Sequence, residues 1–350
     1  MKACVLHAVA DLRCEEVPTP SPQPGQVLVK VAASGICGSD VQRVWQKGTY
    51  SFPTIPGHEF SGHVCALGEG ADESLAGRRV TVFPLVPCMR CEACQVGEYA
   101  SCTDYNYYGS RCDGGFAEYI AVNAWNLVPV PEGVSCEAAA MAEPAAVAIH
   151  TLRRASLEIG DAVAIFGAGP IGLMLAAWVQ AAGGTPLLVD IDRQKIEFAE
   201  QMGFTSLYNG AGDEAVAAIL EITGGRGADI AIEGTGVGKV LEQSFACTRS
   251  FGRVVGMGNP LGEVCLSQKA YWNLMRKQLC LYGTWNSSYA SLYKSDWVLS
   301  LNAMAEGRLA VERFVTHRFS LEQGVKAMEL VRDKNEFYNK VMFVTEEAPS

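Results

Sequence analysis

The hydrophobic pattern divides the chain into two parts near residue 135. In the first part, short Val-rich runs at 27–31, 79–82 and 116–122 are separated by segments rich in Gly and Pro. Four prolines between residues 18 and 24 exclude a helix there. This pattern predicts a compact, mostly β, barrel-like lobe over roughly the first 130 residues.

After residue 135 the pattern changes to alternating helices and strands. Residues 136–155 are rich in Ala, which predicts a helix that leads into a second lobe. Helical stretches then alternate with short apolar runs at 162–166, 187–190, 230–233, 253–257 and 279–283. This alternation predicts a doubly wound parallel sheet with helices on both faces. Beyond Trp285 the chain becomes helical and polar, and 340–344 predicts a strand that returns to the first lobe.

The chain has 350 residues, which favours about two domains. We expect residues 1–148 and 286–350 to form the mostly β domain, and residues 149–285 to form the domain with the parallel sheet. Disorder is expected only in the tail at 346–350.

Composition and charge restrict the class of protein. With 49% hydrophobic and 19% charged residues, the composition is typical of a soluble globular protein. A formal net charge of −10 argues against a nucleic-acid partner, which requires clustered Lys and Arg. Residues 1–7 lack the apolar core of a signal peptide, and no apolar run is long enough to span a membrane. We therefore expect a cytoplasmic protein that acts on a small molecule.

A glycine-rich turn follows the predicted strand at 162–166. It contains Gly167, Gly169 and Gly172, with Pro170 and Ile171 between the last two glycines. Glycines at this spacing allow a tight turn, let a pyrophosphate approach the backbone, and let the helix pack closely on the strand. The turn therefore predicts a dinucleotide-binding site.

Asp190 ends the next predicted strand, about twenty residues after the glycines. Its carboxylate would accept hydrogen bonds from a ribose and repel a 2′-phosphate, so we expect NAD rather than NADP. Arg193 follows closely enough to weaken this preference, and we include it among the expected cofactor-binding residues.

Four of the thirteen cysteines are tightly grouped. The four are separated by two, two and seven residues, and they are Cys88, Cys91, Cys94 and Cys102. This spacing predicts a closed tetrathiolate zinc site that stabilises a loop. An iron–sulfur cluster is the chemical alternative, but its bacterial spacing uses three intervening residues and a following proline. The scattered cysteines are predicted to be small buried side chains, among them Cys4, Cys14, Cys65, Cys136, Cys247, Cys265 and Cys280.

A second group of metal-ligand residue types lies in the first lobe. His58 and Glu59 stand within the segment 57–62, which begins and ends with glycine, and Cys37 lies about twenty residues upstream. A thiolate, an imidazole and a carboxylate are the ingredients of a zinc site that keeps one position open for substrate. Read alone, the His-Glu pair is more simply a hydrogen-bonded histidine beside an exposed glutamate.

Taken together, these motifs resemble the zinc-dependent medium-chain alcohol and polyol dehydrogenases over essentially the whole chain. The most specific element is the segment 57–62 followed by Gly68 and Ala71; the segments 37–40 and 114–119, the cysteine group and the glycine-rich turn follow in the family's order. The resemblance implies a Rossmann NAD-binding domain at 149–285. It implies a mostly β GroES-like barrel catalytic domain, with a structural zinc lobe, at 1–148 and 286–350.

The resemblance also implies a set of zinc ligands. Cys37, His58 and Glu143 would bind the catalytic zinc, and Glu59 would be a close neighbour that binds it in some states. Glu143 lies in the segment 141–144, where polyol dehydrogenases have glutamate and simple alcohol dehydrogenases have cysteine. A carboxylate should leave the zinc more Lewis acidic, which suits vicinal hydroxyls. With the cysteine group, the expected content is two zinc ions per chain.

Ser39, Asp40 and Glu59 are the expected catalytic residues. Ser39 would begin a proton relay, or alternatively cap a helix, and Asp40 would orient the zinc-binding histidine. Zinc would lower the pKa of the substrate hydroxyl, and NAD would accept the hydride. Several relatives place a histidine at the end of this relay, whereas this chain has Gln42, so we expect another proton route.

Within the family, the segments 108–111, 285–289 and 336–342 look most like the galactitol-1-phosphate 5-dehydrogenase branch. The implied reaction oxidises galactitol 1-phosphate to tagatose 6-phosphate, and the expected substrate residues are Tyr50, Arg111 and Trp285. A phosphate needs cationic donors, for which the candidates are Arg111, Arg43, Lys47 and Lys294.

Three alternatives remain open from the sequence. The substrate could be an unphosphorylated polyol of the sorbitol or xylitol kind, or a compound like L-threonine. A remote alternative is a non-catalytic NAD-binding protein. Family members pair through the nucleotide domain, so a homodimer or homotetramer is expected.

Overall fold

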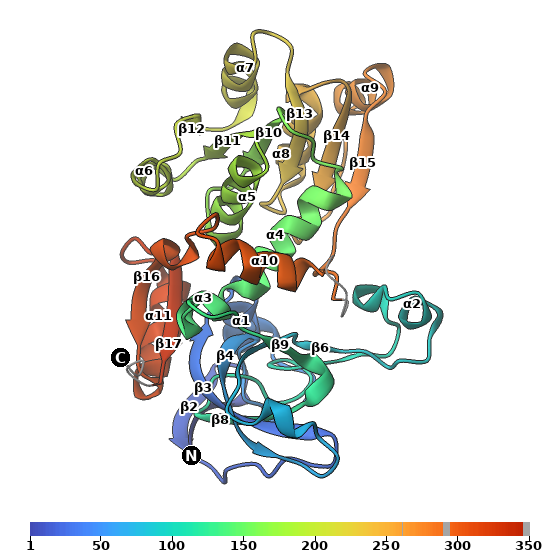
Figure 1. Cartoon of the computed structure of the whole chain (residues 1–350). Coiled ribbons are helices and arrows are strands. Elements are labelled where there is room, and N and C mark those ends of the chain that lie inside the picture. The colour runs from blue at the N-terminus through green and yellow to red at the C-terminus, as the bar shows by residue number, and fades with distance from the viewer. Residues whose placement is uncertain (261, 290–294, 346–350) are drawn as a thin grey trace. The chain divides into compact units, whose positions relative to one another are not determined.

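The computed structural model describes residues 1–260, 262–289 and 295–345 (Figure 1). The chain forms two compact units, which are Met1–Glu143 with Ser288–Ser350, called unit 1, and Pro144–Ser287, called unit 2. The tail at 346–350, for which disorder was predicted, lies outside the described residues. Within the described ranges, no helix combines the length and the apolar character needed to cross a membrane.

Unit 1 is built around a mixed sheet of seven strands. The strand order is β16 (Val315–Phe319), β17 (Lys340–Val344), β3 (Gln26–Gly35), β4 (Glu59–Leu67), β5 (Arg79–Val82) and β9 (Leu127–Pro129), and β8 (Tyr119–Asn123) also pairs with β3. Two antiparallel pairs lie outside this sheet, β1 (Lys2–Ala8) with β2 (Asp11–Glu16) and β6 (Leu85–Val86) with β7 (Asn106–Tyr107).

Short helices connect the strands of unit 1. The α-helices are α1 (Gly38–Gln42), α2 (Glu92–Gln95), α3 (Cys136–Ala140), α10 (Asp296–Ala305) and α11 (Gly324–Asp333). A π-helix, η1 (Arg43–Lys47), continues α1, and 3₁₀ turns occupy Glu73–Leu75, Tyr99–Ser101, Ala124–Asn126, Val311–Phe314 and Leu321–Gln323.

The central strand β3 is largely buried and carries part of the core of unit 1. Val27, Val29 and Val31 point to one face of the sheet and pack against Phe60 and Val64 of β4. Each such side chain contributes about 1.5–3 kcal/mol when it leaves water. The predicted β lobe is therefore confirmed, and residues of both β3 and β4 belong to its core.

Unit 2 contains a six-stranded parallel sheet in the order β12 (Leu207–Asn209), β11 (Thr185–Asp190), β10 (Ala162–Phe166), β13 (Ala228–Glu233), β14 (Thr248–Gly256) and β15 (Cys280–Gly283). Most of α4 (Ala142–Arg154) belongs to this unit, together with α5 (Pro170–Ala181), α6 (Arg193–Gln201), α7 (Gly212–Ile222), α8 (Gly238–Cys247) and α9 (Gln268–Arg276), as Figure 1 shows. This strand order is that of a dinucleotide-binding Rossmann fold, so the predicted fold class is confirmed.

Burial on both faces explains the continuous apolar runs of this sheet. Every residue of β13 is buried, and Phe166, Val189 and Val254 from three other strands join one core cluster. Parallel strands covered by helices on both sides need apolar residues at successive positions rather than at alternate ones.

Two predicted elements differ from those in the structure. The helix predicted at 136–155 breaks at Met141, and α4 (Ala142–Arg154) begins immediately afterwards. Pro144 explains the break, because its ring would clash with the carbonyl four residues earlier in a continuous helix. The strand predicted at 116–122 begins only at Tyr119, because Phe116 and Ala117 pair with β1 instead.

Candidate active site

Cys37, His58 and Glu59 come together where β3 and β4 pair. One ligand atom from each residue lies within 4.8 Å of the others. Cys37 follows β3 as the N-cap of α1, and Glu59 is the first residue of β4, directly opposite Gly35. The antiparallel register therefore unites residues that lie far apart in sequence.

Closely packed glycines hold the turn that leads into β4. Gly57 has a φ of +94°, in the left-handed region that favours glycine, and a Cβ there would collide with the ring of Phe116. A Cβ on Gly109 or Gly114 would collide with the Gly57 carbonyl oxygen, which accepts a hydrogen bond of 2.8 Å from the Gly115 amide. We call Gly57, Gly109 and Gly114 the glycine cluster.

Asp40 is a fully buried carboxylate beside His58. It accepts hydrogen bonds from the Cys37 amide at 3.0 Å and from Arg43 Nη1 at 2.9 Å, and His58 Nδ1 lies 3.2 Å from it. Burial favours a higher pKa for Asp40, but His58 and Arg43 outweigh this and lower the pKa to about 2. Because Nδ1 faces Asp40, His58 is left with Nε2 to offer a metal.

Ser39 is hydrogen-bonded to Arg43 as well. Arg43 Nη1 donates a hydrogen bond of 3.0 Å to Ser39 Oγ as well as the one to Asp40. The N-cap of α1 is Cys37, so the alternative interpretation of Ser39 as a helix cap is wrong. The side chain of Gln42 accepts a hydrogen bond of 3.0 Å from Lys47 Nζ.

Lys340 is a buried cation beside Glu59 that the sequence did not reveal. It is the first residue of β17 and is 2% exposed; its Nζ pairs with Glu59 and donates a 3.0 Å hydrogen bond to the Ile36 carbonyl. Burial favours a lower pKa for Lys340, but the Glu59 carboxylate and the Cys37 sulfur raise it. No pattern around residue 340 distinguishes this lysine from one at the end of an ordinary strand.

Glu143 is buried near the same group of residues but lies outside the set of atoms within 4.8 Å. Burial raises the pKa of Glu143 to about 7, with Glu59 raising it further and with His58 and Lys340 opposing. The charges of His58, Glu59 and Lys340 all act on Glu143, so Glu143 shares the electrostatic environment of the metal-ligand group. Its assignment as a zinc ligand stays a prediction.

Tyr107 is a further site residue that sequence reasoning missed. Its ring centroid lies 5.8 Å from that of His58, and the side chain is buried. Burial raises the pKa of Tyr107 well above its usual value, and the Glu143 carboxylate adds to this effect. A tyrosine in a run of aromatic residues carries no sequence signal for such a position.

The four grouped cysteines converge around one point of unit 1. Their ligand atoms all lie within 4.8 Å of one another, with Sγ–Sγ distances of 3.5 Å for Cys91–Cys94, 3.9 Å for Cys91–Cys102 and 4.0 Å for Cys88–Cys94. A tetrahedron with Zn–S bonds of about 2.3 Å has edges of about 3.8 Å. The spacing of the thiols therefore fits a zinc ion, as the sequence predicted.

The scattered cysteines do not behave uniformly. Cys4 and Cys247 are buried as predicted, whereas Cys65, Cys265 and Cys280 are exposed, so the prediction is wrong for these three. Cys280 lies in the edge strand β15, where a side chain has no neighbouring strand to cover it.

The glycine-rich turn of unit 2 has the geometry of a phosphate-binding loop. Gly167 follows β10 with a φ of +106°, and Gly169 is the N-cap of α5, with Pro170 at the first helical position. A Cβ on Gly169 would meet open space, whereas one on Gly172 would collide with the Gly167 carbonyl. The open backbone at the helix N-terminus can receive a pyrophosphate, and Ile171 lies in the same first turn of α5.

Asp190 ends β11 beside this turn. Its carboxylate oxygens accept hydrogen bonds from the amides of Ala168 at 2.8 Å and Asp192 at 2.9 Å. Arg193 points away into an exposed pair with Glu197, at 2.7 Å. Lys195 is the cation near Asp190, at 3.6 Å, and the sequence analysis did not select it.

Arg111 lies between two tyrosine rings. Its guanidinium carbon is 4.3 Å from the ring centroid of Tyr50 and 4.2 Å from that of Tyr105, and Nη1 donates a 3.1 Å hydrogen bond to the Tyr105 carbonyl. A pocket of about 460 Å³ opens beside them, lined by Tyr50, Val86, Pro87, Cys88, Arg90, Asp104, Tyr105, Asn106 and Arg111. Trp285 lies in unit 2 and is 63% exposed.

The other predicted phosphate donors are less available. Arg43 is committed to Ser39 and Asp40, and Lys47 donates to Gln42 at the surface. Lys294 lies outside the described residues.

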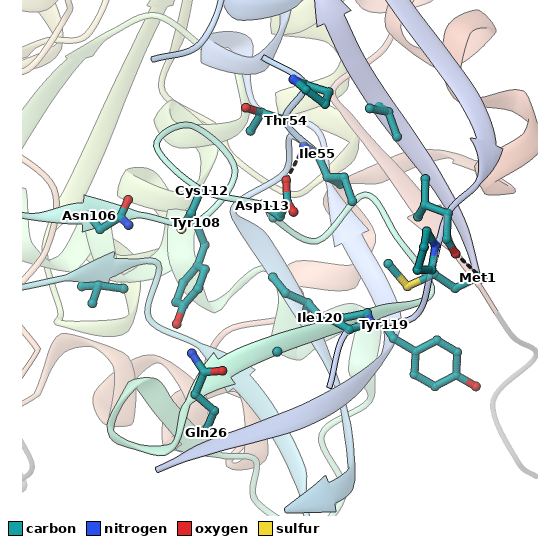
Figure 2. Close-up of a pocket in the computed structure, with 18 of the residues that line it drawn as sticks. Met1, Gln26, Thr54, Ile55, Asn106, Tyr108, Cys112, Asp113, Tyr119 and Ile120 are labelled. Atoms are coloured by element: carbon teal, nitrogen blue, oxygen red, sulfur yellow. Dashed lines mark hydrogen bonds between the residues drawn. The ribbon is translucent and has the colours of Figure 1, made fainter. Parts of the chain in front are cut away.

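A separate cavity of about 610 Å³ lies in unit 1 (Figure 2). Its walls come from several elements, and Asp113 in one wall accepts a hydrogen bond of 2.9 Å from the Ile55 amide. None of the predicted site residues lines this cavity.

Comparison with known proteins gives two matching family models and several relatives of similar length. Residues 23–132 match the alcohol dehydrogenase GroES-like domain, and residues 170–305 match the zinc-binding dehydrogenase domain. The chain is 35% identical to sorbitol dehydrogenase of Bacillus subtilis (strain 168), over 96% of this chain and 95% of that protein. It is 31% identical to galactitol 1-phosphate 5-dehydrogenase of Escherichia coli (strain K12), over 91% and 92%.

Solved structures give the same result. The structure of galactitol-1-phosphate dehydrogenase from Escherichia coli has a TM-score of 0.91 and 30% identity, over 98% of this chain and 100% of that one. A short chain alcohol dehydrogenase from E. coli CFT073 with bound NADH has a TM-score of 0.88 and 27% identity, over 98% and 99%. A protein from Sinorhizobium meliloti 1021, described as a zinc-binding dehydrogenase and bound to NADP, has a TM-score of 0.89 and 28% identity. The match covers 98% of this chain and 98% of that one.

The relatives match over nearly their whole length and differ among themselves in substrate. The chain belongs to the zinc-dependent medium-chain dehydrogenase family and is an oxidoreductase of the alcohol and polyol dehydrogenase type.

Proposed function

We propose that this protein oxidises a sugar-alcohol phosphate to a ketose phosphate with NAD, and that the substrate is galactitol 1-phosphate and the product tagatose 6-phosphate. The observation that carries the proposal is the convergence of Cys37, His58 and Glu59 in one site of a chain that also has the dinucleotide turn. Similarity to galactitol 1-phosphate 5-dehydrogenase of E. coli supports the choice of substrate.

Cys37, His58 and Glu143 would hold the catalytic zinc, and the thiolate, imidazole and carboxylate donors suit that ion. When bound, zinc would lower the pKa of a substrate hydroxyl, and NAD would accept the hydride. Glu59 is a further candidate ligand at this site. Its carboxylate is paired with Lys340, which competes with any metal for it. This pair supports Glu143 rather than Glu59 as the third ligand.

Ser39 would take the hydroxyl proton. Its Oγ accepts one hydrogen bond from Arg43 and keeps a second lone pair for the substrate hydroxyl, so it can receive that proton while its own proton passes to water. Gln42 cannot titrate, so we propose that the proton then leaves through water.

NAD rather than NADP is the proposed cofactor. Asp190 is 9% exposed and holds its carboxylate beside the glycine turn, where a 2′-phosphate would meet its negative charge. The relatives include one with NADH and one with NADP, so the preference rests on Asp190. A specificity constant higher with NADP than with NAD would overturn it.

Arg111 would bind the substrate phosphate. A chain of rings leads to it from His58, because the Tyr107 ring lies 5.8 Å from His58 and 6.4 Å from Tyr105, on which Arg111 stacks. The phosphate of galactitol 1-phosphate stands at the far end of the carbon chain from the carbon that is oxidised. Arg111 is separated from His58 by the rings of Tyr107 and Tyr105, which suits the distance between the phosphate and the carbon that is oxidised.

The test is NADH formation with galactitol 1-phosphate compared with galactitol, sorbitol, xylitol and L-threonine. Arg111→Met should lower kcat/KM for galactitol 1-phosphate by about 10- to 100-fold, because a charge-assisted hydrogen bond is lost. It should change the value for galactitol by less than about twofold, and the matched control Lys47→Met should affect neither. Preference for sorbitol would favour an unphosphorylated polyol, for which the similarity to sorbitol dehydrogenase is the supporting observation.

We also propose that the protein is a homodimer that pairs through unit 2. β15 is an edge strand of the parallel sheet, and Leu281 within it is 46% exposed. Phe251, Tyr271 and Met275 add further exposed apolar area to unit 2. An uncovered edge with apolar side chains is a template for pairing with another strand, here the same strand of a second copy.

A further inference from the structure

Cys4 and Cys14 are two thiols that neither metal site uses. They lie directly opposite each other in the antiparallel pair β1–β2. The Cys4 amide donates to the Phe116 carbonyl at 2.8 Å, away from β2, so the two cysteines form a non-hydrogen-bonded pair. Cα atoms in such pairs lie about 4.5 Å apart, inside the range of about 4.4–6.8 Å that a disulfide spans. The backbone need not move for the two sulfurs to join.

The side chains already point at each other. The two Sγ atoms lie 2.7 Å apart, closer than unbonded sulfur atoms ordinarily approach. Gly324, the first residue of α11, packs against both sulfurs, and a Cβ there would collide with each of them. The helix thus holds the two thiols together from one side.

The two thiols differ in chemistry. Cys4 is fully buried, and its Sγ lies 3.3 Å from the Leu321 carbonyl oxygen; its hydrogen bond with Cys14 and its burial raise the pKa of its thiol. Cys14 is half-buried, and the hydrogen bond from Cys4 and the amides of Gly324 and Val325 lower its pKa to about 7. The carboxylate of Glu322, which pairs with Lys2, opposes this effect. One sulfur can therefore react as a thiolate while its neighbour keeps a proton.

We propose that Cys4 and Cys14 form a reversible redox-modification site that reacts with hydrogen peroxide and closes to an intramolecular disulfide. The Cys14 thiolate attacks the peroxide; an S–O bond forms, the O–O bond breaks, and the released hydroxide takes a proton to become water. The Cys4 sulfur then displaces the oxygen from Cys14, which leaves as a second water with the Cys4 proton. The two thiols lose two electrons, and the peroxide gains them. A dithiol reductant reverses the step by thiol–disulfide exchange.

The test treats the zinc-loaded protein with limiting hydrogen peroxide at pH 7 and maps its peptides by mass spectrometry without reduction. We expect a peptide pair joined through Cys4 and Cys14 that disappears after dithiothreitol. Cys14 should be consumed about tenfold faster than the exposed Cys65, since it is partly thiolate at this pH while burial raises the pKa of Cys65. A chromophoric chelator in the same sample should detect no zinc release.

Two variants separate this site from general oxidation. Cys4→Ala should stop at a sulfenic acid on Cys14 that dimedone traps, and the matched control Cys65→Ser should still form the Cys4–Cys14 link. Should Cys4→Ala fail to fold, Cys14→Ser replaces it, and Cys4 should then resist peroxide. Oxidation of Cys65 before Cys14, or a link that forms only after zinc is released, would overturn the proposal.

Discussion

Arg43 binds Ser39 and Asp40 through one nitrogen, so a single residue controls both the hydroxyl and the carboxylate that orients His58. An arginine keeps its charge throughout the accessible pH range, and its fixed fork restrains both acceptors. A change at Arg43 would therefore affect Ser39 and the Asp40–His58 pair together; Ser39 and Asp40 lie in α1, a helix of five residues whose N-cap is Cys37.

Ser39→Ala should lower kcat by about 100-fold with little change in KM, because a positioned proton acceptor is lost while substrate contacts remain. Steady-state kinetics on the zinc-loaded enzyme measure this, with exposed Ser51→Ala as the matched control. A Ser39→Ala enzyme with full turnover would remove this hydroxyl from the mechanism.

Glu143 predicts a pH effect in the zinc-free protein. Its pKa of about 7 in the fold exceeds the ordinary value of 4.5, so the folded state binds more protons than the unfolded one between these values. Stability is therefore lost as pH rises through this window, by about 3 kcal/mol at most. Urea unfolding of wild type and Glu143→Gln, with chelator, measures the difference; the variant should lack this loss. If the free energy of unfolding varied with pH to the same extent in both proteins, Glu143 would ionise as it does in the unfolded chain.

At the scale of elements, we expect the segment 88–102, which carries the four grouped cysteines, to depend on zinc for its fold. α2 has four residues, far fewer than an isolated helix needs in water, and the neighbouring Tyr99–Ser101 turn is shorter still. The four sulfurs therefore supply the constraint that secondary structure does not.

Cys91→Ser should lower the zinc content from two ions per chain to one and expose residues 88–102 to proteases. Elemental analysis and limited proteolysis measure these two effects, with the exposed Cys265→Ser as control. Retention of both zinc ions by Cys91→Ser would mean that the three remaining sulfurs are enough to bind zinc.

Local patterns predicted most elements but not the contacts between distant ones. The strands of the parallel sheet were evident because burial on both faces produces continuous apolar runs. The role of Lys340 was not evident from the sequence. Its partner Glu59 lies far away in sequence, and only the pairing of β17 with β3 brings the two together. Glu143 emerged from family resemblance alone, because a carboxylate beside a proline has no metal-binding signature of its own.

At the scale of the whole molecule, the edge strand β15 of unit 2 is where a second copy of the chain would pair with this one. Apolar side chains on an edge strand lose the protection that neighbouring strands give, and pairing restores it. The assembly was predicted from family resemblance, and exposure of Leu281 supplies a position at which to test it.

Leu281→Asp should convert the proposed dimer into a monomer, since two carboxylates would face each other near the symmetry axis. Sedimentation velocity measures the molecular mass. Ile222→Asp, which changes a residue of similar exposure, 48%, in α7, should leave the mass unchanged. An unchanged mass in both variants would place the interface elsewhere.

The glycine cluster restricts how this enzyme can diversify. A Cβ on Gly109 or Gly114 would collide with the backbone of Gly57, which no substitution can shrink, and Gly57 itself has a φ of +94°, in the left-handed region that favours glycine. In a library randomised around the metal site, these three positions should return glycine in every folded clone. If Tyr50 and Arg111 contact the substrate as proposed, we expect new substrate preferences to arise there, since Tyr50 is 73% exposed.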